Sequence, residues 1–441
     1  MGFAAIDLGA SSGRVVLGRL AGDRVELEEL HRFANRPVQL PDGLHWNLLH
    51  LFTEALSALR GRTLVGVAVD TWGVDYGLLD ARGRLLGLPY HYRDARTEGV
   101  VERTPDLYPV TGIQTMPINT VYQLLVDERV ADAHAIALVP DLLAYWLSGE
   151  LANERTNAST TGLLDARTGE WSHDLISRLG LPARPFGALV EPGTPLGRAL
   201  AHHEIDAPVY TAASHDTASA YIAAPVRDEH AAILSSGTWS LLGVELPGPV
   251  FSDRALTNER GVDGTIRLLK NVMGLWIEQE CARAWNASYE ELQAAAAEVT
   301  EAPVFDCDDE RFLRGGDVPA LIRELCRRPD MSRGEIVRSI YLSLALRYRQ
   351  VLERLEAATG REITTLHVIG GGARNALLCQ LTADVTGREV LAGPVEATAL
   401  GNVLVQARAA GELGSLADMR AMSAASFEPV HYEPSREEIR L

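Results

Sequence analysis

The chain has 441 residues, 46% apolar and 23% charged, which is enough material for two globular domains. A formal net charge of −18 excludes nucleic acid as an expected partner, because a phosphate-binding surface is usually basic. Since no apolar run reaches the roughly 18–20 residues that cross a bilayer and no signal segment precedes the first predicted strand, we expect a cytoplasmic protein without a membrane partner.

In the first half of the chain, short apolar strands alternate with helical patterns, which is typical of an α/β fold. The pattern predicts a helix over residues 48–61, which ends at Gly61. It also predicts strands over residues 3–9, 14–20, 25–33 and 63–73. Residues 90–205 are richer in proline and turn signals. We expect them to form an inserted wall of loops and helices.

The turn "GASSG" follows Asp7 and the first predicted strand. Its small residues leave backbone N–H groups and the hydroxyls of Ser11 and Ser12 accessible, which suits phosphate oxygens. Asp7 could hold Mg²⁺ directly or through water, and Arg14 could contact the transferred group. A glycine-punctuated hairpin with a capping aspartate explains the same residues.

The second half begins with "AAILSSGTWSLLGVEL", which repeats the strand, small-residue turn and strand of the N-terminus and suggests an internal duplication. Later, "VIGGGARN" predicts a strand, a glycine turn against which adenine or ribose could lie, and a helix starting near Asn375. A further helix follows the Gly-Pro turn at residue 393. We place the domain boundary at residue 222, with domains over 1–222 and 223–441.

Three polar motifs follow predicted strands or begin helices. Asp216 in "SHDTASA" stands at the carboxyl end of a short strand, where it could accept a proton from an attacking hydroxyl or simply cap a helix. The motif "VDTWGVDYG" carries Asp70, Trp72, Gly73 and Asp75, which could line a polyhydroxylated ligand or form a buried turn. Asn271 in "LLKNVMGLWIEQE" could bind a sugar hydroxyl or cap a helix.

Lysine and cysteine usage limits the possible chemistry. Lys270 is the only lysine, there is no P-loop motif, and the role of this one side chain stays open between a solvated and a functional group. The four cysteines lack Cys-x-x-Cys or metal-ligand spacing, and we expect reduced, half-buried thiols at positions 281, 307, 326 and 379.

These motifs together resemble the FGGY family of carbohydrate kinases. The matching stretches occur in order from residue 3 to about 410 and are "AIDLGASSGR", "VDTWGVDYGLLD", "YRDAR", "SHDTASA", "LSSGTWSLLG", "LLKNVMGLW", "VIGGGARN" and "GPVEATALGN". The resemblance implies two actin-like ATPase (ribonuclease H-like) domains with the active cleft between them. It also implies Mg·ATP-dependent phosphorylation of L-rhamnulose at its first-carbon hydroxyl.

The resemblance also assigns roles to residues at matching motif positions. Asp216 would accept the proton and Asp7 would lie near the magnesium. Sugar contacts would come from Gly73, His215, Thr217 and Asn271. ATP contacts would come from Ala10, Ser11, Ser12, Gly13, Arg14, Thr238, Gln279 and Gly371. Because Ser339 stands where a partner for Cys326 would be expected, we predict no structural disulfide.

Three other functions fit parts of this pattern. A kinase of another ketose, such as L-fuculose or L-ribulose, differs only in a few hydrogen bonds to one hydroxyl. A nucleotide-gated interaction protein would need the predicted ATP-binding turns but not "SHDTASA", and a sugar-sensing pseudokinase would not need Asp7 and Asp216. The oligomeric state cannot be read from the sequence.

Overall fold

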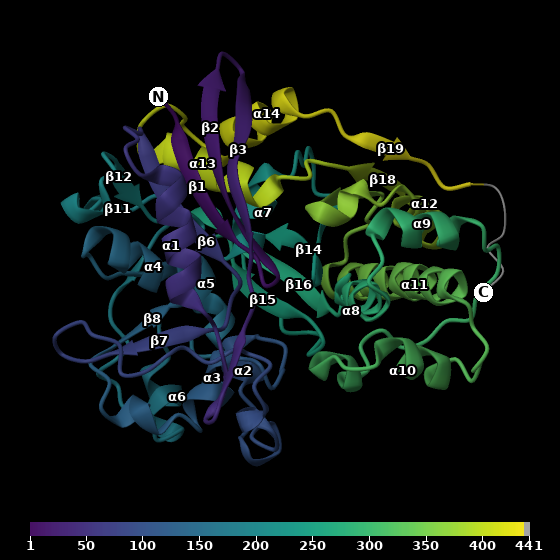
Figure 1. Ribbon diagram of the computed structural model, residues 1–441, viewed down its shortest axis with the longest axis horizontal. Coiled ribbons are helices and arrows are strands. Elements are labelled where there is room, and N and C mark those ends of the chain that lie inside the picture. The colour runs from purple at the N-terminus through teal and green to yellow at the C-terminus, as the bar shows by residue number, and fades with distance from the viewer. Residues whose placement is uncertain (436–441) are drawn as a thin grey trace. The chain divides into compact units, whose positions relative to one another are not determined.

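The computed structural model describes residues 1–435, which form two compact units (Figure 1). Unit 1 contains Met1–Pro225, Glu245–Leu268 and Ala397–Ser426, and unit 2 contains Val226–Val244, Leu269–Glu396 and, of the described residues after these, 427–435. The first segment of unit 1 ends close to the predicted boundary at residue 222. Two later segments return to this unit, so unit 1 is discontinuous in sequence.

A six-stranded sheet forms the centre of unit 1. Its strands, in spatial order, are β11 (Pro195–Arg198), β12 (Pro208–Tyr210), β6 (Gly66–Thr71), β1 (Phe3–Leu8), β2 (Ser12–Ala21) and β3 (Arg24–Ala34). β1 pairs in parallel with β6 and antiparallel with β2. Every residue of β1 and β6 is buried, as expected for strands covered on both faces. All four strands predicted in this part of the chain are confirmed.

The helices of unit 1 come from both ends of the chain. They are α1 (Leu48–Leu59), α2 (Tyr108–Thr111), α3 (Thr120–Leu124), α4 (Val139–Ser148), α5 (Arg155–Ala158), α6 (His173–Arg178), α7 (Asp216–Ala223), α13 (Ala397–Ala409) and α14 (Leu416–Ser426). Asn47 caps the predicted helix α1, its side chain accepting from the His50 N–H. Figure 1 shows α13, in yellow, beside the purple β1, and α13 contacts β1, β6 and α7.

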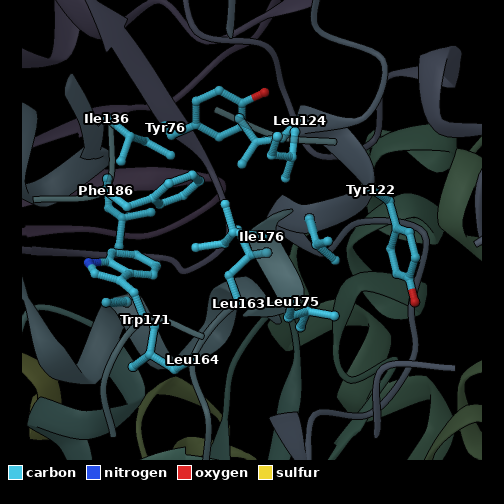
Figure 2. Close-up of a cluster of buried hydrophobic side chains, with 14 of the residues drawn as sticks. Tyr76, Tyr122, Leu124, Ile136, Leu163, Leu164, Trp171, Leu175, Ile176 and Phe186 are labelled. Carbon is cyan, nitrogen blue, oxygen red and sulfur yellow. The ribbon is translucent and has the colours of Figure 1, made fainter. Parts of the chain in front are cut away.

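The segment predicted as an inserted wall has a hydrophobic core of its own (Figure 2). The Trp171 and Phe186 rings lie 5.1 Å apart in this core, and Tyr76 and Ile136 come to it from two paired strands. Three two-stranded sheets support the region: β4 (Val38–Leu40) with β5 (Gly43–His45), β7 (Tyr76–Leu79) with β8 (Ala135–Leu138), and β9 (Asn153–Glu154) with β10 (Leu189–Val190). The insertion is therefore a packed subdomain that contains short strands in addition to the predicted loops and helices.

The second large sheet has seven strands. In spatial order they are β15 (Thr257–Arg260), β16 (Ile266–Val272), β14 (Ser240–Leu246), β13 (Ala231–Ser236), β17 (Thr365–Ile369), β18 (Glu389–Ala392) and β19 (Val430–Tyr432). β13 pairs antiparallel with β14 and parallel with β17. The same pattern surrounds β1, which pairs antiparallel with the next strand and parallel with a later one, as an internal duplication predicts.

The helices of unit 2 are α8 (Trp276–Trp285), α9 (Tyr289–Ala297), α10 (Val318–Leu325), α11 (Arg333–Thr359) and α12 (Ala376–Thr386). α11 starts at a capping box of Ser332 and Glu335 and ends at Gly360, which has φ 69°. α12 starts directly after Asn375, whose side chain accepts from the Leu378 N–H, as predicted.

The four cysteines are free. Three of them are buried rather than half-buried, because they lie on or beside helices that pack into the interior of unit 2, and only Cys326 is partly exposed. The Cys326 sulfur lies 3.6 Å from the Ser339 hydroxyl. Within residues 1–435, no helix combines the length and apolar character that crossing a membrane requires.

Candidate active site

Three acidic side chains gather at the carboxyl ends of the parallel strands of unit 1. Asp7 and Asp70 are register partners on β1 and β6, and the next β6 residue, Thr71, bridges in parallel to His215, immediately before Asp216. The carboxyl ends of parallel strands are the usual ligand-binding edge of an α/β sheet. Unit 1 therefore brings the predicted proton acceptor and the predicted magnesium residue to one edge.

Asp7 and Arg14 form an ion pair across the β1–β2 hairpin. The Arg14 Nε and Nη2 atoms lie 2.8 and 2.6 Å from Asp7 Oδ2. Burial lowers the pKa of Arg14, but the charge and hydrogen bonds of Asp7, together with the charges of Asp70 and Glu29, outweigh burial and raise the pKa above its ordinary value. The two residues predicted to serve the metal and the phosphate are thus held together before any ligand binds.

Asp70 is fully buried, and its side chain is held by a residue of α13. The Asn402 amide nitrogen lies 2.5 Å from Asp70 Oδ2, and Gln406 donates to Asn402 and to the Ala4 carbonyl. Burial, followed by the charge of Asp7, raises the pKa of Asp70 well above its ordinary range. Burial and the charge of Asp7 therefore disfavour a third negative charge at this edge.

Asp216 is the first residue of α7, and 29% of its side chain is exposed. Its Oδ1 atom accepts from the Thr217 N–H at 2.5 Å and from the Thr217 hydroxyl at 3.1 Å. Burial raises the pKa of this carboxyl above its ordinary value, and Asp7 adds to the increase against an opposing effect of His215. A carboxylate with a raised pKa is a stronger base, which suits proton uptake.

His215 is buried next to Asp216 and contacts two charged residues of the same unit. Its Nε2 atom lies 3.4 Å from Asp216 Oδ1, and its Nδ1 atom lies 3.3 Å from Glu259 Oε2 and 3.2 Å from Arg267 Nη2. Glu154 holds the preceding residue, accepting from the Ser214 N–H and hydroxyl at 2.9 and 2.8 Å. The imidazole is therefore fixed from both sides.

The turn between β1 and β2 is closed by a residue that sequence reasoning missed. The Asn35 side chain donates to the Gly9 carbonyl at 2.9 Å, and its backbone N–H donates to the Ser11 carbonyl at 3.0 Å. Within residues 1–435, the amides of Ala10 and Ser11 donate no hydrogen bond, which suits anion binding.

Gly13, also expected at the phosphates, has a packing role in the same turn. A Cβ at this position would lie 2.4 Å from the Phe33 ring. The small residues of the turn therefore have two roles. Gly13 makes room for the Phe33 ring, and Ala10 and Ser11 leave their backbone N–H groups accessible.

The motif after β6 contains a strained residue. Val74 has φ 70°, which is unusual for a β-branched side chain, and its N–H donates to the Thr160 hydroxyl at 3.1 Å. A Cβ on Gly73 would lie 2.9 Å from the same hydroxyl. The small size of Gly73 therefore serves packing against Thr160, and the sugar contact predicted for it can involve only its backbone.

Asp75 is the polar centre of an aromatic cluster. Its Oδ2 atom accepts from the indole nitrogens of Trp46 and Trp72 at 2.5 and 3.0 Å and from the Tyr92 N–H at 3.2 Å. Gln123 donates to the other oxygen at 2.9 Å. Burial raises the pKa of Asp75 to about 6 against these donors. The two indole rings, 3.9 Å apart, form a fixed wall.

In unit 2, two residues predicted to contact ATP also contact each other. The Thr238 hydroxyl lies 3.3 Å from the Gln279 side-chain oxygen. The backbone of the β13–β14 turn is bound to the start of α8, since Leu275 and Trp276 donate to the carbonyls of Gly237 and Thr238 at 3.0 Å each. This arrangement repeats in unit 2 the rigid small-residue turn of unit 1.

The three glycines after β17 have different roles. Gly370 has φ 83°, which only glycine adopts readily. A Cβ on Gly372 would lie 2.0 Å from the Ser236 hydroxyl, so this glycine packs against the end of β13. A Cβ on Gly371 would meet no atom within 4 Å. Gly371 is therefore the member of the set with open space in front of it.

Lys270 and Asn271 lie near the carboxyl end of β16, which ends at Val272. The Lys270 ammonium lies 3.5 Å from Asp308 Oδ2, which also lies 3.2 Å from Arg347 Nε. The lone lysine is thus a half-buried ion-pair partner rather than a solvated side chain.

The structure therefore divides the predicted site residues between the two units. Unit 1 holds Asp7, Ala10, Ser11, Ser12, Gly13, Arg14, Gly73, His215, Asp216 and Thr217, and unit 2 holds Thr238, Asn271, Gln279 and Gly371. Within residues 1–435, no group of three side chains could by itself hold a metal ion.

Comparison with known proteins gives matches over nearly the whole chain. The model of the N-terminal domain of the FGGY family of carbohydrate kinases matches residues 3–222, and the model of its C-terminal domain matches residues 232–410. A curated protein from Enterococcus faecalis named rhamnulokinase is 44% identical over 98% of this chain and 94% of its own length. One of the same name from Bacteroides thetaiotaomicron is 41% identical over 98% and 96%.

Solved structures share the fold at low sequence identity. A gluconate kinase from Lactobacillus acidophilus superposes with a TM-score of 0.80 at 14% identity, covering 98% of this chain and 93% of its own. A ligand-bound xylulose kinase from the same organism gives 0.80 and 14%, with 98% and 94% coverage. These likenesses confirm the predicted α/β, actin-like fold.

Proposed function

Because the chain belongs to the FGGY family of carbohydrate kinases, we propose that it phosphorylates L-rhamnulose at the first-carbon hydroxyl, using ATP. The observation that carries the choice of sugar is the identity of 40–44% to five relatives named rhamnulokinase, over nearly the full chain. As a member of this family the protein is a carbohydrate kinase. The reaction would take place in the cytoplasm, where free cysteines persist.

Asp216 would act as the proton acceptor. Its position at the carboxyl end of the sheet, its partial exposure and its raised pKa support this role. Thr217, which donates twice to the same carboxyl oxygen, would orient it, leaving Oδ2 for the sugar hydroxyl. His215, the Gly73 backbone and Asn271 would provide the other sugar contacts.

ATP would be bound without the lysine that a P-loop provides. The open amides of Ala10 and Ser11, the hydroxyl of Ser12 and the guanidinium of Arg14 would receive phosphate oxygens. Thr238, Gln279 and the open face of Gly371 would contribute from unit 2. We retain 1–222 and 223–441 as the two functional halves of the chain.

Mg²⁺ fits the donor set at Asp7. This ion keeps several water ligands and usually binds through one or two carboxylates and the substrate phosphates rather than in an all-protein cage. The edge of β1 provides one carboxylate, paired with Arg14, beside Asp70, whose pKa is raised well above its ordinary range by burial and by the charge of Asp7. When bound, the ion would neutralise charge on the phosphate oxygens.

In this mechanism the chain positions two reactants and moves one proton. Asp216 accepts the proton of the sugar hydroxyl as that oxygen attacks the γ-phosphorus in line, and the bond to the leaving ADP oxygen breaks. The hairpin amides and Arg14 stabilise charge on the transferred group.

A substrate panel tests the proposal. Coupled release of ADP is measured with ATP, Mg²⁺ and each of L-rhamnulose, L-fuculose, L-ribulose and D-xylulose, with ATP alone as the control. L-Rhamnulose is expected to give the highest kcat/KM. An inert L-rhamnulose beside an active second ketose would overturn the choice of sugar, and hydrolysis of ATP that ignores every sugar would overturn the kinase activity.

A further inference from the structure

Behind Asp216, unit 1 contains a buried ionic cluster of His215, Glu259 and Arg267. We infer that Arg267 is a positioning residue that holds His215 as the tautomer with its proton on Nε2. In this state His215 can donate to the sugar but cannot take its proton. The inference rests on the proposed function for the identity of the ligand, and only on the geometry of the cluster for the tautomer.

Arg267 is a buried cation with few partners. It lies in β16, its side chain is 0% exposed, and its Nε donates to the Arg260 carbonyl at 3.1 Å. Its Nη2 atom lies 3.2 Å from both His215 Nδ1 and Glu259 Oε2, while its Nη1 atom has no hydrogen-bond partner within residues 1–435. The guanidinium is therefore already short of acceptors.

This shortage decides the position of the histidine proton. A guanidinium can only donate hydrogen bonds, so His215 Nδ1 must accept if the 3.2 Å contact is a hydrogen bond. A proton on Nδ1 would place two donors against each other and leave a second buried N–H of Arg267 without an acceptor. A buried donor that finds no acceptor destabilises the folded protein. The neutral imidazole therefore carries its proton on Nε2.

Glu259 is the group that could reverse this preference. Its Oε2 atom lies 3.3 Å from His215 Nδ1 and could accept a proton from it. The same oxygen, however, balances the charge of Arg267, which a buried cation needs. The two arrangements differ in the protonated ring nitrogen, which can be measured.

The assigned tautomer separates the roles of two neighbouring residues. His215 Nε2 lies 3.4 Å from Asp216 Oδ1, which already accepts two hydrogen bonds from Thr217. The Nε2 proton is therefore available to an oxygen of a bound sugar beside the carboxylate. Since the imidazole lone pair on Nδ1 is occupied by Arg267, Asp216 is left as the proton acceptor.

The first test reads the tautomer without any substrate. In the full chain labelled with ring ¹⁵N-histidine, a ¹H–¹⁵N multiple-bond spectrum distinguishes a protonated Nε2 from a protonated Nδ1, and a His215→Gln variant assigns the signals. A neutral ring with its proton on Nε2 is expected. A proton on Nδ1 would overturn the inference, whether or not the protein phosphorylates any ketose.

The second test removes the cluster as a pair, because Arg267→Met alone would leave a buried carboxylate. In Arg267→Met/Glu259→Leu, loss of one positioned hydrogen bond is expected to raise the KM for the ketose about tenfold, with the KM for ATP unchanged. Arg267→Lys, which keeps a donor and the charge, should stay within about threefold of the native value. The double variant Arg420→Met/Glu245→Leu removes another part-buried ion pair of unit 1 and should leave both constants unchanged.

An unchanged KM for the ketose in Arg267→Met/Glu259→Leu would overturn the positioning role. An equal rise of this KM in the control variant Arg420→Met/Glu245→Leu would overturn it as well. If that variant does not fold, the tautomer in the native protein decides alone. Failure of every ketose as substrate would instead overturn the proposed function and leave the tautomer measurement standing.

Discussion

Gly371 and Gly372 are adjacent, yet alanine at each position should have opposite effects on stability and nucleotide binding. A methyl group on Gly371 meets no atom within 4 Å, and the residue has ordinary backbone angles. We expect Gly371→Ala to leave the free energy of unfolding unchanged or to raise it by up to about 1 kcal/mol. If adenine lies against this backbone, the same methyl occupies ligand space and the KM for ATP rises about tenfold or more.

Gly372→Ala is the matched variant. Its methyl would lie 2.0 Å from the oxygen and 2.5 Å from the Cβ of Ser236, and a Cβ cannot rotate away. Overpacking of this kind costs about 1–3 kcal/mol. For a domain of this size, each kcal/mol lowers the Tm by about 2–4 °C.

Thermal unfolding and ADP-release kinetics at varied ATP separate the two variants. A Gly371→Ala protein with native KM for ATP would remove Gly371 from the nucleotide site. A Gly372→Ala protein with native Tm would refute the packing role of Gly372. It would also show that the space around an added Cβ does not distinguish the roles of Gly371 and Gly372.

Three further predictions concern unit 1. Asp216→Asn should lower kcat by on the order of 10²-fold or more, with the ketose KM nearly unchanged, and native turnover in ADP release would exclude Asp216 as the proton acceptor. Because burial raises the pKa of Asp75 to about 6, the folded state keeps a proton that the unfolded state loses near pH 4. Asp75 therefore makes the protein less stable as pH rises from about 4 to 6, by about 3 kcal/mol in total, and this loss persists above pH 6. Urea unfolding of the native protein and of Asp75→Asn should therefore differ in pH dependence only between about pH 4 and 6. Asn35→Ala should cost about 1 kcal/mol and raise the KM for ATP several-fold, because the Gly9 carbonyl loses its donor; an unchanged KM would mean that the turn does not need Asn35.

The elements whose structure depends on residues close together in sequence were predicted correctly. The apolar run before Asp7, the small-residue turn and the strand after it gave the β1–β2 hairpin, and Asn375 gave the start of α12. The side chain of Asp216 was placed at a strand end because the apolar strand and the helix beside it are both visible in sequence. That Asp216 lies near Asp7 and Asp70 depends on the pairing of β1 with β6, which brings Asp7 opposite Asp70.

Contacts between distant residues could not be predicted in this way. Gly13 and Gly73 were interpreted as openings for a ligand, whereas Phe33 and Thr160 use the space, and neither partner is marked by a local pattern. Asn402 and Gln406 did carry a signal, since two amides four residues apart in an apolar helix must find buried partners. Arg267 carried the same kind of signal, as a charge within an apolar strand.

The return of α13 to the N-terminal sheet has a consequence for how the protein is made. Asp70 and the Ala4 carbonyl are capped by side chains that the ribosome adds some 330 and 400 residues later. Until that helix leaves the exit tunnel, the first sheet exposes a bare apolar face and an uncovered carboxyl group. The amino-terminal sheet therefore cannot be covered on this face until residues 402 and 406 have been synthesised, and during this interval we expect the nascent chain to need protection from aggregation.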